Sequence, residues 1–595
     1  MQNKKRVIEI RRVIEYHQFF EKEKPIDVVA TLKQFNRHKL IRMATVLSLF
    51  YGNLHIPDSK RTLFSNCSQK YIEYLNHCFD IYLEKINCQP GQKVELVTYR
   101  TTLELWRHIF AIKAGEYQNI VKDEDAELLL FKVILTLNEK VVYIKGSDKK
   151  KFELDELLFL SSFLTNDSNN YNFQSVLQPQ LYYFYCFVNA IEKDKMLTAA
   201  SNTLLKKWSI ASWRQYLATF LHIAQETENY RISHQCGTPI FNPDVIQEHD
   251  QTGLFSSALV KSLSIEENEF IPYNDTGDEN KMQKNVDYRM FRARPIVKLK
   301  DNAGYVVINI QLLCERIFNS LCFDFLPLLN GREGSVGVYD FNKEFVEKIL
   351  FRTTFFRCIP ASQFTYPLRD SIAGNEDSHE PDFYFRFRDN LVIVECKAIK
   401  MNGEIRDDGD YSRLLEELHE KLVLKTKNLN PTRKEFKRKP EPIGLGQLVY
   451  HIDKIDGDEF QWDTNIPEAV VYYPLLVFED VRLLQPGLLS LLNRWFNELL
   501  ADKKELAHIS YQPVMAVSIN TLFLYDGLIR KKGLTRIINQ FVAKCSVTDT
   551  HGTIKLVEDA DFDGYLRMNT FKKENFIGEW LTNEIKTTSK DLYLI

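Results

Sequence analysis

Two acidic side chains and a lysine stand close together in the sequence, and their functional groups have complementary chemistry. Asp382 follows a proline, and Glu395 and Lys397 lie two residues apart a short way downstream. Carboxylate oxygens are ligands that a hard cation such as Mg²⁺ prefers, and the bound metal lowers the pKa of a coordinated water and neutralises a phosphate. An ammonium group beside them can orient that water or stabilise charge that develops on the phosphate. These residue types predict a site for a divalent cation and a phosphate.

The residues between them predict the strands that would bring the three side chains together. Phe383–Phe387 alternates aromatic and polar side chains, Leu391–Val394 is a short apolar run, and a turn pair separates the two. Side chains two apart on a strand point to the same side, so Glu395 and Lys397 share a face. A hairpin would place Asp382 beside them. The alternative is a surface hairpin with an ordinary ion pair.

Pro381-Asp382 followed by Glu395-Cys396-Lys397 resembles the PD-(D/E)xK signature of the restriction-endonuclease-like nuclease superfamily. The resemblance implies an α/β fold whose mixed-sheet core has the element order αβββαβ. It also implies Mg²⁺ or Mn²⁺ as the cofactor, with Asp382 and Glu395 as metal ligands and the Cys396 carbonyl as a further one. Lys397 then assists the attacking water or the phosphate.

The same resemblance suggests supporting residues on two helices. Members of the superfamily often carry a glutamate on the helix before the first core strand, aimed at the metal; Glu344 is the first choice here and Glu347 the second. A solvated helix face is the alternative for either acid. A glutamine on a later helix contacts the metal-bound water or the substrate, and Gln447 fits that place. Tyr450 follows Gln447 one residue too early for the commonest form of the motif, and His451 is expected on the helix surface.

Basic residues after the hairpin are candidates for binding nucleic-acid phosphates. Most fall in a proline-flanked polar segment that is expected to form a mobile loop, where clustered cations next to a metal site can contact a phosphate backbone. A solubilising loop is the alternative. The candidates are Lys400, Arg433, Lys434, Lys437, Arg438 and Lys439.

Composition limits the class of protein. The chain has 595 residues, 44% of them hydrophobic and 26% charged, which is typical of a globular protein with two to four domains. A net charge of −3 means that any surface for nucleic acid must be local. No apolar run reaches about 18 residues, so we expect no membrane association. The 10 cysteines are scattered without metal-binding spacing, which favours reduced thiols in a cytoplasmic protein.

The chain is expected to divide into four parts. Residues 1–230 show apolar residues at helical spacing and form a mainly α-helical region that binds a partner or nucleic acid. Residues 231–335 combine a polar linker with a β-hairpin and one apolar helix, Leu312–Phe325. Residues 336–550 form the nuclease-like domain, and residues 551–595 a C-terminal docking segment.

Two functions of different classes follow. The first is a Mg²⁺- or Mn²⁺-dependent nuclease that hydrolyses phosphodiester bonds, in DNA in preference to RNA. By analogy, a helical arm on such a domain suggests a prokaryotic restriction or anti-phage defence effector. The second is a catalytically silent nuclease-like scaffold that binds nucleic acid or protein. A protein partner or a second copy of the chain is compatible with both functions.

Overall fold

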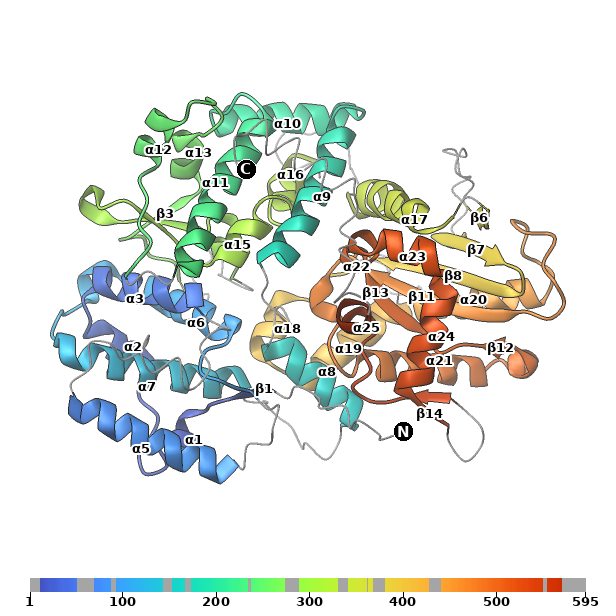
Figure 1. The fold of residues 1–595 in the computed structure, drawn as a ribbon, viewed down its shortest axis with the longest axis horizontal. Coiled ribbons are helices and arrows are strands. Elements are labelled where there is room, and N and C mark those ends of the chain that lie inside the picture. The colour runs from blue at the N-terminus through green and yellow to red at the C-terminus, as the bar shows by residue number, and fades with distance from the viewer. Residues whose placement is uncertain are drawn as a thin grey trace, which may run out of the picture.

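The computed structural model has a mixed α/β fold in which helices predominate (Figure 1). None of the helices in the described part of the chain is long and apolar enough to cross a membrane. The structure describes residues 11–50, 69–86, 93–142, 152–165, 173–233, 237–272, 288–329, 341–360, 362–366, 380–426, 440–548 and 554–569.

The largest sheet lies at the right of Figure 1 and has six strands in the order β12-β11-β8-β7-β6, with β13 also pairing with β11. The β6, β7 and β8 strands form an antiparallel meander, whereas β11 is parallel to β8, β12 and β13. The strands are β6 (Phe364–Tyr366), β7 (Phe383–Phe387), β8 (Asn390–Lys397), β11 (Val471–Phe478), β12 (Ser510–Tyr511) and β13 (Met515–Ser518).

The central strands are apolar because both faces of the sheet are covered. In β8, Leu391–Val394 is fully buried, as expected for a strand with a parallel neighbour that helices enclose. The predicted hairpin is present, since Phe383 pairs with Val394 in antiparallel register. The next position in that register brings Asp382 beside Glu395.

Helices connect the strands and pack against the sheet, α20 against β8 and β11 and α22 against β13. Along the chain, a helix precedes the three-strand meander, and further helices lie between β8 and β11. The helices of this part are η5 (Asn342–Phe351, π-helical), α17 (Arg352–Cys358), α18 (Gly403–Asp408), α19 (Tyr411–Leu422), α20 (Leu445–Asp456), η6 (Val481–Leu483), α21 (Leu488–Ala501), η7 (Lys504–His508), α22 (Ile519–Leu524), α23 (Asp526–Lys532) and α24 (Leu534–Cys545).

The preceding part of the chain is largely helical, with the parallel pair β1–β2 and the small sheet β3–β4–β5. Its strands are β1 (Arg11–Val13), β2 (Lys93–Glu95), β3 (Ser264–Glu266), β4 (Ile296–Lys298) and β5 (Tyr305–Val307). Its helices are α1 (Tyr16–Phe19), α2 (Val28–Lys33), α3 (Arg37–Phe50), α5 (Gln69–Ile86), α6 (Tyr99–Phe110), η1 (Ala114–Glu116), α7 (Asp123–Val142), α8 (Leu154–Thr165), α9 (Phe173–Ile191), α10 (Lys195–Lys207), α11 (Trp213–Ile232), α12 (Pro243–His249), α13 (Ser257–Ser262), α14 (Arg289–Ala293), η4 (Lys300–Asn302), α15 (Ile310–Glu315) and α16 (Cys322–Leu329).

The described residues form two hydrophobic cores, and the boundaries of these cores differ from those of the four predicted parts. One core takes residues from 14–137 and 265–312, and the other takes residues from 159–263 and 296–566. The hairpin β4–β5 lies between them, since Ile296 belongs to the second core and Val297 to the first. The helices of the predicted 1–230 region are therefore shared between two cores, and no core boundary falls at residue 230.

The segment from 231 to 335 differs from its prediction in two ways. Its polar first half contains α12 and α13, whose first turns are capped by the side chains of Asn242 and Ser256. The single predicted helix Leu312–Phe325 is wrong, because the structure has α15 and α16 with a break between them. That break lets the fully buried Arg316 form an ion pair with Asp324 at 2.6 Å.

The C-terminal segment is described as far as residue 569. It contains the antiparallel pair β14 (Ser546–Thr548) and β15 (Ile554–Leu556), followed by α25 (Phe562–Asn569). Phe562 and Leu566 are buried in the second core, so α25 packs against it. The apolar residues on which the docking prediction rests lie between 571 and 595. Residues 570–595 lie outside the described residues. The described cysteines are free thiols.

Candidate active site

Asp382, Glu395 and Lys397 meet at one end of the large sheet, where β7 begins and β8 ends. The Lys397 ammonium lies 3.0 Å from Glu395 Oε2 and 3.9 Å from Asp382 Oδ2. Asp382 Oδ2 accepts a 2.7 Å hydrogen bond from the backbone N–H of Cys396, which ties the start of β7 to β8. The side chains of Glu395, Lys397 and Asp382 are 1%, 9% and 24% exposed, so the cluster is buried but Asp382 reaches solvent.

Burial and mutual repulsion shape the titration of this cluster. Burial and the charge of Glu395 raise the pKa of Asp382 well above its usual range, against the opposing effect of Lys397. Burial alone would raise the pKa of Glu395, but Lys397 and His451 lower it below its ordinary value. Burial also works against the charged form of Lys397, yet the two carboxylates raise its pKa. Two carboxylates that are costly to ionise together are the electrostatic setting in which a divalent cation binds favourably.

Gln447 joins the cluster from the first turn of α20. Its Oε1 accepts hydrogen bonds from the Lys397 ammonium at 2.8 Å and from the backbone N–H of Gly444 at 2.9 Å. Gly444 has a φ of +55°, and a Cβ there would lie 2.6 Å from the carbonyl oxygen of Leu422 at the end of α19. Only glycine fits this close approach, so the sequence Gly444-Leu445-Gly446 fixes the start of α20 and thereby the position of Gln447.

His451 was predicted on the helix surface, and this is wrong. Its side chain is 1% exposed, and its Nε2 lies 3.2 Å from Glu395 Oε1. His451 follows Gln447 by four residues, so both side chains project from the same face of α20 toward the sheet. That spacing was the available signal for His451. Tyr450 lies beside it, with ring centroids 5.5 Å apart.

The two candidate acids on the preceding helix behave differently. Glu344, the first choice, forms an ion pair with Lys348 at 2.9 Å near the protein surface. The charge of Glu347 instead raises the pKa of both Asp382 and Lys397. Glu347 is therefore the acid whose charge acts on the cluster, and the first choice of Glu344 is not favoured by the structure.

The residues present fit a hard divalent cation. Glu395 Oε1 is buried 3.2 Å from His451 Nε2, but it has no hydrogen-bond donor in good alignment. A carboxylate oxygen left in this state is available as a ligand. Among the described residues no group of three or more His, Cys, Asp and Glu side chains is arranged to hold a metal. Mg²⁺ needs fewer protein ligands, since it commonly takes one or two carboxylates and completes its shell with waters and phosphate.

Cys396 has a structural place in the cluster through its backbone, whose N–H orients Asp382. Burial raises the pKa of its thiol well above the usual range, so the sulfur is not a thiolate ligand. Lys400, the first of the predicted phosphate contacts, places its ammonium 5.0 Å from the centre of the Phe323 ring. The other predicted contacts lie in residues 427–439, outside the described residues; the antiparallel strands β9 (Leu424–Thr426) and β10 (Pro440–Pro442) flank that segment.

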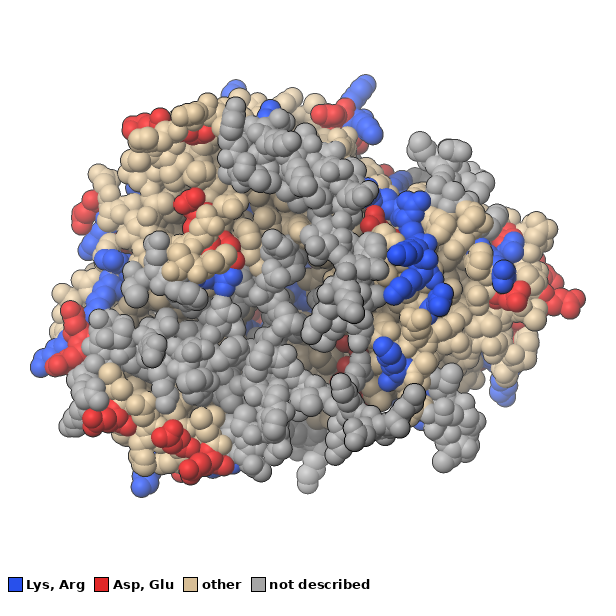
Figure 2. All heavy atoms as spheres, in the orientation of Figure 1, with Lys and Arg blue, Asp and Glu red and all other residues tan. Residues whose placement is uncertain are grey.

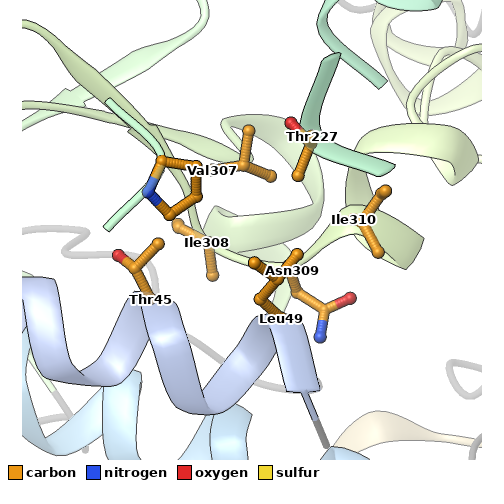
Figure 3. A pocket seen from close by; sticks show the side chains of 8 residues that line it. Thr45, Leu49, Thr227, Val307, Ile308, Asn309 and Ile310 are labelled. Atoms are coloured by element: carbon orange, nitrogen blue, oxygen red, sulfur yellow. The ribbon is translucent and has the colours of Figure 1, made fainter. Parts of the chain in front are cut away.

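A small cavity elsewhere in the molecule does not compete with this site. Figure 3 shows it between α3 and β5, lined by Thr45, Leu49 and Asn309 among others. Its volume is about 10 Å³, enough for a single water molecule. The buried Asn309 Nδ2 has no acceptor among the described residues, and a water there would supply one.

Comparisons with protein-family models, with curated proteins and with solved structures give no match, so the chemistry of the site rests on its own geometry.

Proposed function

We propose that this protein is a Mg²⁺- or Mn²⁺-dependent nuclease that hydrolyses phosphodiester bonds, with DNA as the preferred substrate. The observation that carries the proposal is the convergence of Asp382, Glu395, Lys397 and Gln447 on one end of a mixed sheet. These residues come from three separate elements. Burying two carboxylates in contact with one ammonium costs free energy, and clusters that carry this cost are common at functional sites.

Each residue has a role that follows from its chemistry. Asp382 and Glu395 supply carboxylate oxygens for the cation, which would lower the pKa of a bound water and neutralise a substrate phosphate. The Lys397 ammonium orients a water molecule or stabilises charge on the phosphate. Gln447 accepts a hydrogen bond from Lys397 and so fixes the direction of the ammonium. His451 lies against Glu395 and fixes the carboxylate orientation.

The order of elements supports the same proposal. A helix, the β6–β7–β8 meander, helices ending with α20, and the parallel strand β11 follow one another along the chain. This order agrees with the αβββαβ arrangement that the PD-(D/E)xK resemblance implies. A role as a prokaryotic restriction or anti-phage effector is a further proposal, which rests on analogy with nucleases that carry large helical arms.

Cleavage assays test the proposal directly. Supercoiled plasmid, single-stranded DNA and RNA are incubated with the purified protein and Mg²⁺ or Mn²⁺, alongside the variants Lys397→Ala and Asp382→Ala. We expect metal-dependent cutting of DNA that both variants lose. A protein that binds DNA and Mn²⁺ but cuts none of these substrates would instead be the silent scaffold.

A matched control separates loss of chemistry from loss of structure. Glu344→Gln removes an exposed acid on the adjacent helix, and it should cut DNA as the wild type does. Cutting that survives in both Lys397→Ala and Asp382→Ala would show that the activity comes from another site or another protein.

A further inference from the structure

A cleft of about 540 Å³ is lined by residues of α12, α13 and all three strands of the small sheet β3–β4–β5. Sites that hold a small molecule commonly have volumes of about 300–1,000 Å³. Most of the residues that line this cleft are polar. Acidic and basic side chains are mixed over the upper left of the molecule in Figure 2, the part that carries α12, α13 and β3 in Figure 1. The cleft therefore suits a polar ligand of small-molecule size.

The strand register places three polar side chains of the cleft in one row. Glu266 of β3 pairs with Lys298 of β4, and Lys298 pairs with Tyr305 of β5. Residues that pair across neighbouring strands point to the same face of a sheet. The Lys298 ammonium donates a hydrogen bond to Glu266 Oε1 at 3.0 Å. Lys298 thus lies between the carboxylate and the tyrosine.

The other wall of the cleft carries a second ion pair, in which the Lys261 ammonium lies 2.6 Å from Asp244 Oδ1. Gly304 allows the chain that leads into α12 to lie directly on β5. Its φ is +109°, and a Cβ there would lie 2.6 Å from Ile240 Cγ2. Only glycine fits this close approach, so it fixes the distance between the sheet and the wall that carries Asp244.

The Tyr305 hydroxyl lies among these four charged groups. Burial raises the pKa of Tyr305, whereas Lys298 and Lys261 lower it, and each lysine acts on it more strongly than Asp244 or Glu266 does. The two ammonium groups are therefore directed toward the hydroxyl more closely than the two carboxylates are. Among the described residues this hydroxyl has no hydrogen-bond partner. Two ammonium groups and one hydroxyl are available as donors to a single anion.

We propose that this cleft binds a phosphate group, either as free phosphate or on a small molecule, with Lys261, Lys298 and the Tyr305 hydroxyl as its donors. A phosphate group has several strong acceptor oxygens and up to two negative charges, so it can contact both lysines together. The two lysine side chains are 48% and 37% exposed. Exposed ion pairs contribute little to stability, so a phosphate can replace the carboxylates as partner of the lysines. The proposal is independent of the nuclease function.

Isothermal titration calorimetry of the full chain without divalent metal tests the proposal, with inorganic phosphate, AMP and adenosine as probes. We expect phosphate and AMP to bind, and adenosine, which has no phosphate, not to bind. Tighter binding of AMP than of phosphate would identify a phosphorylated small molecule as the ligand, and equal affinity would identify free phosphate. Absence of binding by both, or adenosine binding as tightly as AMP, would overturn the proposal.

Variants assign the binding to the cleft. Tyr305→Phe and Lys298→Ala each remove one donor and should weaken phosphate binding about tenfold or more, as loss of a hydrogen bond to a charged group does. Asp244→Asn should bind phosphate more tightly, because Lys261 loses its competing carboxylate. Lys300→Ala is the matched control. It removes an exposed lysine from the turn between β4 and β5 that does not line the cleft, and it should leave the affinity unchanged.

Unchanged affinity in both donor variants would overturn the proposal, as would an equal loss in Lys300→Ala. Weaker binding in Asp244→Asn would also contradict it, since the carboxylate would then support the ligand. Circular dichroism establishes that each variant is folded, and Lys261→Ala replaces Tyr305→Phe if that variant is not. Since neither metal nor cleavage enters these measurements, their outcome leaves the nuclease proposal untouched.

Discussion

Two clusters of buried charged side chains differ in how well their charges are paired. The interdomain cluster consists of Glu104, Arg107, Tyr288 and Asp407, and joins α6 to α18. Arg107 contacts Glu104 and Asp407 at 2.7 Å each, and the Tyr288 hydroxyl donates to Glu104 Oε1 at 2.7 Å. The pKa of Glu104 is lowered, because Arg107 and Arg100 outweigh the effect of burial. Its carboxylate is well satisfied by its partners.

The sheet-end cluster of Asp382, Glu395, Lys397, Gln447 and His451 is buried to a similar extent but is not satisfied in the same way. One oxygen of Glu395 has no aligned donor. Each cluster has one carboxyl whose pKa burial raises, Asp382 here and Asp407 in the interdomain cluster, so a raised pKa does not separate the two. Both clusters are buried, so burial alone does not identify a functional site. The Glu395 oxygen without an aligned donor does distinguish them, because no carboxylate oxygen of Glu104 or Asp407 is left in that state, and incompletely satisfied buried groups occur at functional sites.

The largest expected effect is on the interdomain cluster. Arg107→Met leaves Glu104 and Asp407 buried without their main partner, and we expect the free energy of unfolding to fall by about 3–5 kcal/mol. Urea denaturation followed by circular dichroism measures this. The surface variant Arg536→Ala is the control and should change stability by less than about 0.5 kcal/mol. A similar small change for Arg107→Met would mean that the cluster has no structural role.

The second prediction concerns Asp382, whose replacement should impair cleavage without lowering stability. Asp382→Asn should reduce DNA cleavage by about 10²–10³-fold, as loss of one preorganised electrostatic group does. In the absence of metal it should not destabilise the protein. Because the folded-state pKa of Asp382 is raised, its unfavourable contribution grows as pH rises above the normal carboxyl range, and Asn removes that contribution.

Unfolding of wild type and Asp382→Asn at a series of pH values between acid and neutral measures this linkage. The difference should favour the variant increasingly as pH rises. Glu104→Gln should do the opposite. The lowered pKa of Glu104 gives stability that is present above its unfolded pKa and is lost as pH falls. Parallel pH profiles for the two variants would contradict the contrast between the clusters.

The third prediction concerns the histidine that lies against Glu395. His451→Ala should weaken Mn²⁺ binding by about 10–100-fold, the usual effect of losing a group that orients a metal ligand. His451→Gln keeps a polar group near Glu395 Oε1 and should restore part of the affinity. If His451→Ala lowered only thermal stability and left Mn²⁺ affinity intact, the histidine would have a purely structural role.

The smallest effect separates the two acids on η5. Glu347→Gln should lower cleavage by up to about tenfold, because its charge acts on Asp382 and Lys397. Glu344→Gln should leave cleavage unchanged and alter stability by about 0.3–0.5 kcal/mol, the contribution of an exposed ion pair one helical turn apart. Equal cleavage rates for the two variants would show that neither acid reaches the site.

The sequence predicted the parts of this structure that depend on local patterns. Asp382, Glu395 and Lys397 lie on a single hairpin, whose alternating aromatics and apolar run determine the register. Gln447 was named from the PD-(D/E)xK resemblance, which implies a glutamine on the helix after the hairpin. Glu344 and Glu347 lie on the same predicted helix, and no local pattern separated them. The structure makes this helix, η5, π-helical, which sets the directions of its side chains differently from an α-helix.

Non-local contacts account for the rest. His451 meets Glu395 only when α20 packs on β8, and a single amphipathic pattern does not reveal which polar residue faces the sheet. The two cores share the hairpin β4–β5, so their boundary depends on pairing between distant segments. The break between α15 and α16 occurs where Arg316 is fully buried and paired with Asp324. The contact of His451 with Glu395 and the pairing that sets the boundary between the cores join residues far apart in the sequence, so a local pattern does not predict them.

Titration of Mn²⁺ into the protein by isothermal calorimetry tests the central claim, that the sheet-end cluster is a metal site. The account predicts saturable binding in the wild type and in Glu344→Gln, lost in Asp382→Asn and in Glu395→Gln. Thermal unfolding of each protein establishes that it is folded. Absence of binding in the folded wild type, or equal affinity in Asp382→Asn, would contradict the account.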